Sequence, residues 1–196
     1  TDPGQKLQSG VREIPYPVFI KPVKGGDSIG VDALSIAFNK QDMDAKIKQI
    51  FDTYQSPSLV EKYLSGREYS VGILEDEKTK VLTAMPIEII TGKNKDGHRI
   101  LDFDVKKTDQ ERVKKVLDEN LHGQLSEMGK SVFKILGGKS FGRIDIKLCG
   151  ENIPHFMEAN LMPGLSKGYF FRSCALNLGI GYEQMILLIA GNRLTD

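Results

Sequence analysis

The chain has 196 residues, of which 40% are hydrophobic and 27% charged, a composition typical of a soluble globular protein with a proper core. Its net charge of +1 argues against nucleic acid or an anionic membrane as a partner. No apolar run is long enough to span a membrane, and no signal-peptide pattern opens the sequence. The two cysteines form no disulfide or zinc spacing, which favours a reducing cytoplasm.

The first predicted elements surround a glycine-rich loop. Residues 16–23 are rich in β-branched and aromatic side chains and predict a strand that carries one charge, Lys21. The loop over residues 24–30 offers a hydroxyl and flexible backbone N–H groups of the kind that wrap phosphate, although the ending of a Walker A loop is missing. Most glycine loops are ordinary turns, so the loop alone is compatible with both interpretations.

The next segments predict alternating strands and helices. Residues 31–38 predict a returning strand, and Asp42 predicts the N-cap of a helix over residues 43–54. Thr108, with Glu111 at the capping-box position, predicts the first of two helical pieces, the second ending at Gly137. The other predicted strands are 59–64, 67–74, 81–90 and the two strands of a hairpin over 141–161, and a final amphipathic helix runs up to Gly191. Hairpins interspersed with helices indicate the α+β class.

The hairpin over residues 141–161 carries a polar face. Strict alternation puts two sets of side chains on that face: Phe141, Arg143, Asp145 and Lys147 from the first strand, and Phe156, Glu158 and Asn160 from the second. If Glu151 and Asn152 form the centre of the turn, Asp145 lies opposite Glu158 and Arg143 lies opposite Asn160.

Two facing carboxylates cost stability unless positive charge lies between them. Oxygen ligands from Asp, Glu and Asn are those that Mg2+ prefers, usually together with waters and substrate phosphates. A solvated polar face is the alternative, and it is the commoner fate of mixed-charge strands. The clean apolar face of the hairpin and the ending Asn160-Leu161-Met162-Pro163-Gly164 favour the metal site.

Five motifs occur in order along the chain: VFIKPVKGGDSIGV, LVEKYLSGREYSV, LDFDVKK, GRIDIKL and EANLMPG. In this order and spacing they resemble the ATP-grasp superfamily, and within it the D-alanine–D-alanine ligases, from about Pro17 to the last helix. The resemblance implies two α+β subdomains that clamp ATP, without the family's N-terminal domain. Residues 1–56 would belong to the central subdomain, on the phosphate-loop side, and residues 57–196 to the C-terminal subdomain with the metal site.

The resemblance also implies roles for individual residues. Arg143 would stabilise a tetrahedral intermediate, and Lys106 would be a second catalytic cation. In the ATP site, Lys21, Gly26, Ser28 and Lys106 would contact the phosphates, Glu61, Lys62 and Leu64 would hold the adenine, and Glu68 would take the ribose hydroxyls. The metal ligands would be Asp145, Glu158 and Asn160, which would hold two Mg2+ or Mn2+ ions. Gly164 and Ser166 would border the acceptor substrate.

The activity implied by the resemblance is ATP-dependent ligation of a carboxylate to an amine through an acylphosphate, as in peptidoglycan precursor synthesis for the cell wall. The substrates would be amino acids, and the full-length protein would be cytoplasmic and a homodimer. Lys107 and Lys167 depart from the family pattern, which leaves open a ligase with another acceptor. A non-catalytic ATP-binding module is the alternative from another functional class.

Overall fold

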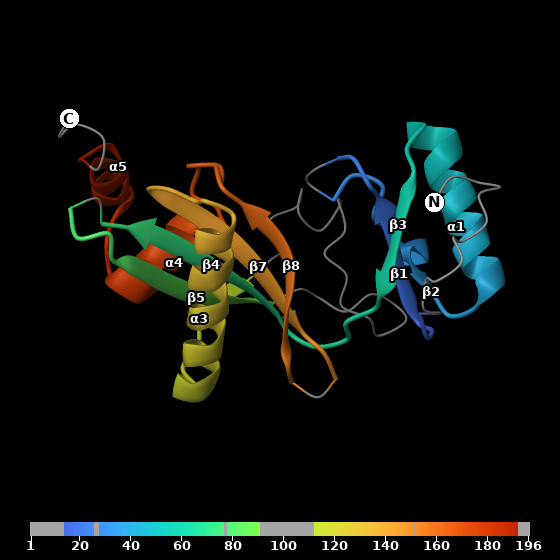
Figure 1. The fold of residues 1–196 in the computed structure, drawn as a ribbon, viewed down its shortest axis with the longest axis horizontal. Coiled ribbons are helices and arrows are strands. Elements are labelled where there is room, and N and C mark those ends of the chain that lie inside the picture. The colour runs from blue at the N-terminus through green and yellow to red at the C-terminus, as the bar shows by residue number, and fades with distance from the viewer. Residues whose placement is uncertain (1–13, 26–27, 77, 91–111, 151, 192–196) are drawn as a thin grey trace. The chain divides into compact units, whose positions relative to one another are not determined.

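A computed structural model describes residues 14–25, 28–76, 78–90, 112–150 and 152–191. The described residues divide into two compact units, one before and one after the boundary between Ser65 and Gly66, and each is described by itself (Figure 1). The sequence had suggested a division after residue 56. The observed boundary lies later because β3 (Ser58–Lys62) pairs along its whole length with β1 (Val18–Pro22) of the first unit.

The first unit is a three-stranded antiparallel sheet covered on one face by a helix. The strand order is β2-β1-β3, with β2 at Ile36–Ala37, and the helix is α1 (Lys40–Tyr54). The buried core between them consists of Val18, Ile20, Ala37, Ile47 and Ile50. Because side chains alternate along a strand, Phe19 and Lys21 of β1 point away from α1.

Two predictions in this unit were partly wrong. The cap of α1 is Asn39, whose side-chain oxygen accepts the backbone N–H of Asp42 at 2.9 Å, so Asp42 lies in the first turn. The predicted strand over 31–38 is a 3-10 turn, η1 (Ala33–Ser35), followed by the two-residue β2. Asp32 caps η1 and also accepts a 2.8 Å ion pair from the buried Lys46 of α1. These contacts fasten the segment that follows the glycine loop onto the helix.

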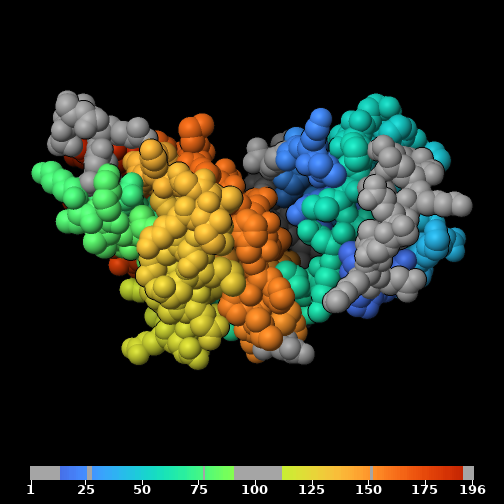
Figure 2. Space-filling model, in the orientation of Figure 1, coloured from blue at the N-terminus to red at the C-terminus, as the bar shows by residue number. Residues whose placement is uncertain are grey.

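The second unit is a five-stranded antiparallel sheet with helices on both faces. Its strand order is β6-β5-β4-β7-β8. The strands are β4 (Glu68–Glu75), β5 (Leu82–Ile90), β6 (Arg112–Lys115), β7 (Phe141–Leu148) and β8 (Pro154–Asn160). Helix α3 (Glu119–Ile135) covers one face and is the yellow surface in the space-filling view (Figure 2). Helices α4 (Tyr169–Leu178) and α5 (Tyr182–Gly191) pack on the other.

The core under α3 is built from one parity of each strand. Leu125 and Phe133 of the helix pack against fully buried side chains of β4 and β7, among them Val71 and Ile144. Gly129 lets the helix approach closely, since a Cβ atom at that position would lie 2.9 Å from a methyl of Val71. The predicted apolar face of the hairpin is therefore confirmed as a core face.

The opposite face of this sheet is divided in two. At one end Met85, Phe141 and Leu74 pack with α4 and α5. Further along the same face, the strands carry polar side chains, which form the candidate site described below. The packing of α3 on one face and α4 at one end thus leaves a defined polar region on β4, β7 and β8.

Two helix predictions in this unit were wrong in detail. Residues 112–115, expected within the first of two helical pieces, form the edge strand β6, and a single helix α3 follows with Asp118 as its cap. The predicted cap at Thr108 and Glu111 lies outside the described residues. The final helix is broken into α4 and α5 at Gly179, whose φ of +69° is left-handed.

Cys149 lies at the turn after β7 and Cys174 on the buried face of α4. Burial raises the pKa of the Cys174 thiol to about 11. Among the described residues, no single helix is long and apolar enough to cross a membrane. Helices α4 and α5 together, bent by 98° at their break, reach the length and composition of a broken span.

Candidate functional site

The predicted pairing of the hairpin is confirmed. Asp145 of β7 lies opposite Glu158 of β8, and Arg143 lies opposite Asn160. The same face continues onto β4, where Ser70 pairs with Asp145. Alternation of side chains along three strands therefore brings carboxylates, an amide, a hydroxyl and a guanidinium onto one patch of sheet.

The turn half of the hairpin departs from strict alternation. Asp145 pairs with Glu158 but the next residue, Ile146, pairs with Phe156, so Met157 is an extra residue in β8. Phe156 is therefore itself the partner of Ile146, a buried core residue, and does not pair on the polar face, where the sequence had put it. On the turn side Lys147 pairs with His155 and Leu148 with Pro154, a register that alone would put Asp145 opposite Met157, so the bulge restores the pairing of Asp145 with Glu158.

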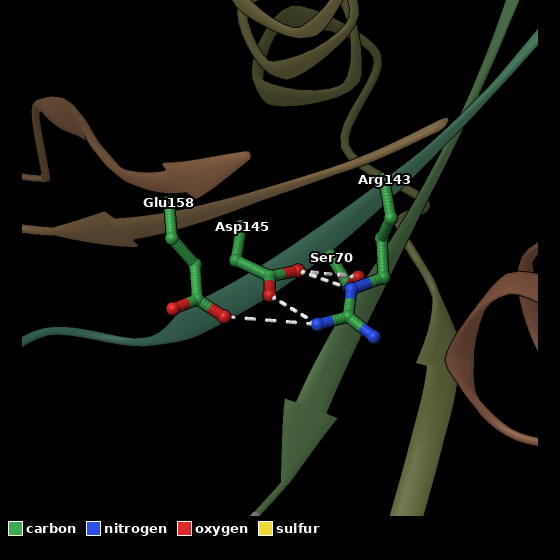
Figure 3. Close-up of polar contacts among 4 residues, drawn as sticks. All are labelled: Ser70, Arg143, Asp145 and Glu158. Carbon is green, nitrogen blue, oxygen red and sulfur yellow. Dashed lines mark hydrogen bonds and ion pairs between the residues drawn. The ribbon is translucent and has the colours of Figure 1, made fainter. Parts of the chain in front are cut away.

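Arg143 supplies the positive charge between the two carboxylates. Its Nε donates to Asp145 Oδ1 at 3.0 Å and its Nη2 to Asp145 Oδ2 at 2.8 Å, while Nη2 lies 3.7 Å from Glu158 Oε1. The hydroxyl of Ser70 donates to Asp145 Oδ1 at 2.7 Å. Figure 3 shows the three charged side chains on one side of the sheet, with the guanidinium joined to both carboxylates. Bidentate arginine–carboxylate pairs of this kind fix geometry as well as charge.

The surroundings of Arg143 hold it charged and oriented. Burial alone would lower the pKa of its guanidinium, but the Asp145 carboxylate, with Glu158 and Tyr169, raises that pKa above its ordinary value. The ring of Tyr169, the first residue of α4, lies beneath the guanidinium with 5.6 Å between the Arg143 Cζ atom and the ring centroid. The arginine is thus fixed by contacts from two sides.

The residues on this face fit a magnesium ion in kind. Asp145 Oδ1 already accepts two hydrogen bonds, whereas Oδ2 accepts one and keeps a lone pair. Glu158 has 59% of its side chain exposed, and Asn160 offers an amide oxygen in the same patch. No cluster of three His, Cys, Asp or Glu forms among the described residues. A site with two carboxylates suits Mg2+, which relies on waters and substrate phosphates for its remaining ligands.

A second charged pair lies further along the same strands. Glu68, the first residue of β4, is directly opposite Lys147 of β7, and its Oε2 lies 3.4 Å from Lys147 Nζ. Gly164 and Ser166, the predicted acceptor-site residues, are both exposed in the loop between β8 and α4. The second unit therefore contains the predicted ribose, metal and acceptor residues.

The first unit contains the predicted phosphate and adenine residues. Lys21 and Glu61 lie on the sheet face away from α1 and form an ion pair of 2.8 Å. Lys62, paired with Val18, lies on the opposite face from Glu61. Ser28 adopts a left-handed φ of 60° in the glycine loop.

Leu64, another predicted adenine-site residue, is half-buried between β3 and β4. The predicted residues Gly26 and Lys106, and Lys107, lie outside the described residues.

Three polar neighbours of the site were given no role by the sequence. Lys147 and Ser70 could have been found, because each shares strand parity with a predicted site residue on its own strand. Tyr169 could not, since it follows a loop of irregular structure after β8 and reaches Arg143 only through the position of α4.

Solved structures share this architecture. A D-alanine–D-alanine ligase from Bacillus anthracis, crystallised with ATP, matches 90% of this chain and 52% of its own with a TM-score of 0.68 and 20% identity. The VanG D-Ala:D-Ser ligase from Enterococcus faecalis matches 91% of this chain and 50% of its own, with a TM-score of 0.67 and 23% identity. The fold is accordingly of the ATP-grasp class, as the sequence predicted.

The sequence comparison gives the family. The profile of the D-ala D-ala ligase C-terminus matches residues 2–190, and the chain belongs to that family. A D-alanine–D-alanine ligase from Clostridium perfringens is 28% identical over 180 residues, 90% of this chain and 54% of the relative. One from Geotalea uraniireducens is 28% identical over 186 residues, 93% of this chain and 56% of the relative. The chain thus spans about half the length of the curated relatives it matches.

Proposed function

We propose that the protein carrying this chain is an ADP-forming, ATP-dependent carboxylate–amine ligase that joins two D-alanine molecules for cell-wall peptidoglycan. The observation that carries the proposal is the Arg143 guanidinium bound to Asp145 and close to Glu158, on one face with Asn160. A protein that only bound nucleotide would have little use for an arginine fixed beside the metal ligands. Membership of the ligase family supports the same conclusion.

The reaction proceeds in two steps that both involve crowded negative charge. A substrate carboxylate attacks the γ-phosphorus of ATP, giving an acylphosphate and ADP. The amine of the second amino acid then attacks the acyl carbon, and phosphate leaves after the tetrahedral oxyanion collapses. Arg143 stabilises that oxyanion, and loss of one such donor commonly raises a barrier by about 2.7–4 kcal/mol.

The remaining residues bind and orient the substrates. Lys21, Gly26, Ser28 and Lys106 contact the phosphates, Glu61, Lys62 and Leu64 the adenine, and Glu68 the ribose. Gly164 and Ser166 border the acceptor amino acid. Asp145, Glu158 and Asn160 would hold two Mg2+ or Mn2+ ions, which would supply positive charge to the phosphate oxygens. Because Lys107 and Lys167 depart from the family pattern, the second form of this proposal is a ligase that uses a different acceptor amino acid.

The two compact units correspond in this proposal to the central and C-terminal subdomains of the fold, with the boundary at Ser65. The full-length protein works in the cytoplasm on free amino acids and forms a homodimer. It needs no nucleic acid or membrane partner for the reaction.

The direct test measures phosphate release by the full-length protein with ATP, Mg2+ and a panel of D- and L-amino acids. Release of ADP and phosphate only with D-alanine, and formation of the dipeptide by mass spectrometry, is the expected result. ATP binding without turnover on any amino acid would refute the ligase. AMP and pyrophosphate as products would refute the acylphosphate route.

Matched variants separate the site from general damage. Glu158→Gln removes an exposed carboxylate on the polar face, and Glu127→Gln removes one on α3, where it pairs with Lys130. The first should reduce Mg2+-dependent turnover by at least tenfold, and the second should leave it unchanged. Equal effects of the two substitutions would argue against a metal site at Glu158.

A further inference from the structure

Lys147 is a buried lysine on the candidate site face. Its side chain is 10% exposed and that of Glu68, directly opposite on the neighbouring strand, is 17% exposed. The Nζ atom of Lys147 and the Oε2 atom of Glu68 are 3.4 Å apart. Lysine is rarely buried unless it is paired, so this partner is part of the reason it can lie there.

The pair occupies a definite place relative to the other site residues. Across β4 and β7 the same face presents three successive rows: Glu68 with Lys147, Ser70 with Asp145, and Gly72 with Arg143. Two residues along a strand advance by about 7 Å, so each row is roughly that far from the next. The Glu68–Lys147 row thus lies one step from the candidate metal ligand and on the side away from Arg143.

The spacing between neighbouring rows suits the phosphates and the sugar of one nucleotide. With the phosphates at the Asp145 row, the adjoining row is where the sugar of the same molecule would lie. A carboxylate only accepts hydrogen bonds, so Glu68 can receive the hydroxyls of a ribose. The lysine holds one of its oxygens, which fixes the carboxylate before the sugar arrives and reduces the ordering cost of binding.

We propose that Lys147 is a positioning residue of the nucleotide site, holding the Glu68 carboxylate against the ribose hydroxyls. The Glu68–Lys147 pair then sets the preference for a ribonucleotide over a 2′-deoxyribonucleotide. The inference rests on the proposed function in one respect, that this face binds ATP. A hydrogen bond to a charged group contributes about 1.5–3 kcal/mol, which corresponds to roughly a 10- to 100-fold preference for ATP.

The test compares the binding of ATP and 2′-deoxy-ATP to the full-length protein by titration calorimetry with Mg2+. Wild type should bind ATP at least tenfold more tightly than the deoxynucleotide. Lys147→Met should bring the two affinities within about threefold of each other, and so should Glu68→Gln. The double variant should show no further loss of the preference for ATP. Lys147→Arg keeps the charge and should restore most of the preference.

A matched control is Lys130→Met, which removes a lysine–glutamate pair on α3 and should leave the preference unchanged. If Lys147→Met fails to fold, Lys147→Gln replaces it. The preference of this variant for ATP should be at least threefold smaller than that of wild type. A Lys147 variant with a lower melting temperature but an unchanged ratio of affinities would show a purely structural pair and overturn the inference. Wild type without preference would also overturn it, whereas no binding of either nucleotide would refute the proposed function itself.

Discussion

Asp145→Asn should destabilise the ligand-free protein far more than Glu158→Gln, although both remove a predicted metal ligand. Asparagine keeps the shape of aspartate but turns an N–H donor toward the Arg143 guanidinium, which is only 15% exposed. Removing one partner of a buried ion pair typically costs about 3–5 kcal/mol. Because Glu158 lies 3.7 Å from the same guanidinium and takes over part of the charge, the expected loss is about 2–3 kcal/mol.

This loss can be measured by thermal unfolding. For a chain of this size, about 1 kcal/mol corresponds to roughly 2–4 °C, so Asp145→Asn should lower the melting temperature by roughly 4–12 °C. Glu158 is 59% exposed, and its long contact with Arg143 should contribute less than about 1 kcal/mol. Both proteins are unfolded in EDTA, followed by circular dichroism, and then again in excess Mg2+.

The two variants should differ by the same margin with and without metal, since each has lost a ligand and should gain little from Mg2+. Equal melting temperatures in EDTA would show that the contact between Asp145 and Arg143 does not stabilise the fold as described. A normal Mg2+ response in both variants would show that the metal binds elsewhere.

Four further predictions concern packing and ionisation. Gly66→Ala should destabilise the protein by about 1–3 kcal/mol, because its Cβ would lie 2.4 Å from the Leu148 carbonyl oxygen. Gly123→Ala, on an exposed helical position with open space, should instead stabilise it by up to about 1 kcal/mol in urea unfolding. Burial raises the pKa of Tyr69 from 10.0 to about 12, so the folded state keeps its proton longer than the unfolded state. Stability should therefore be intact below pH 10 and fall as the pH rises toward 12, and the Phe variant should flatten that fall in urea titrations. Cys174, fully buried and with its pKa raised to about 11, should resist iodoacetamide at pH 8 until the protein is unfolded, as mass spectrometry would report.

The polar hairpin was predictable because alternation is a local rule. The residues of FGRIDIKL and PHFMEAN carry their faces in their own spacing. The opposite face of β7 is buried and that of β8 is half-buried, which favours one register. The pairing of Asp145 with Glu158 was predicted from a turn centred on Glu151 and Asn152, but in the structure it depends on the extra residue in β8. The bulge at Met157 could not be predicted, because an extra residue in a strand leaves no mark in a pattern of polar and apolar letters.

Other errors have a common cause in tertiary context. Residues 112–115 have no periodicity that separates an edge strand from the start of a helix, and pairing with β5 decides the matter. The compact units divide later than residue 56 because β3 follows a helix break but pairs backward with β1. The contact of Tyr169 with Arg143 depends on where a whole helix packs, which no local pattern encodes.

The bulge also bears on how this hairpin can change length over evolution. Met157 is one residue more than regular pairing needs between Glu158 and the turn. If one residue were lost from the turn, β8 would straighten at Met157 and slide by one residue toward the turn. Asp145 would stay opposite Glu158, and the loop would keep its present length. The strand holds a spare residue, so the tip of the hairpin can vary in length while the charged residues at its base keep their places.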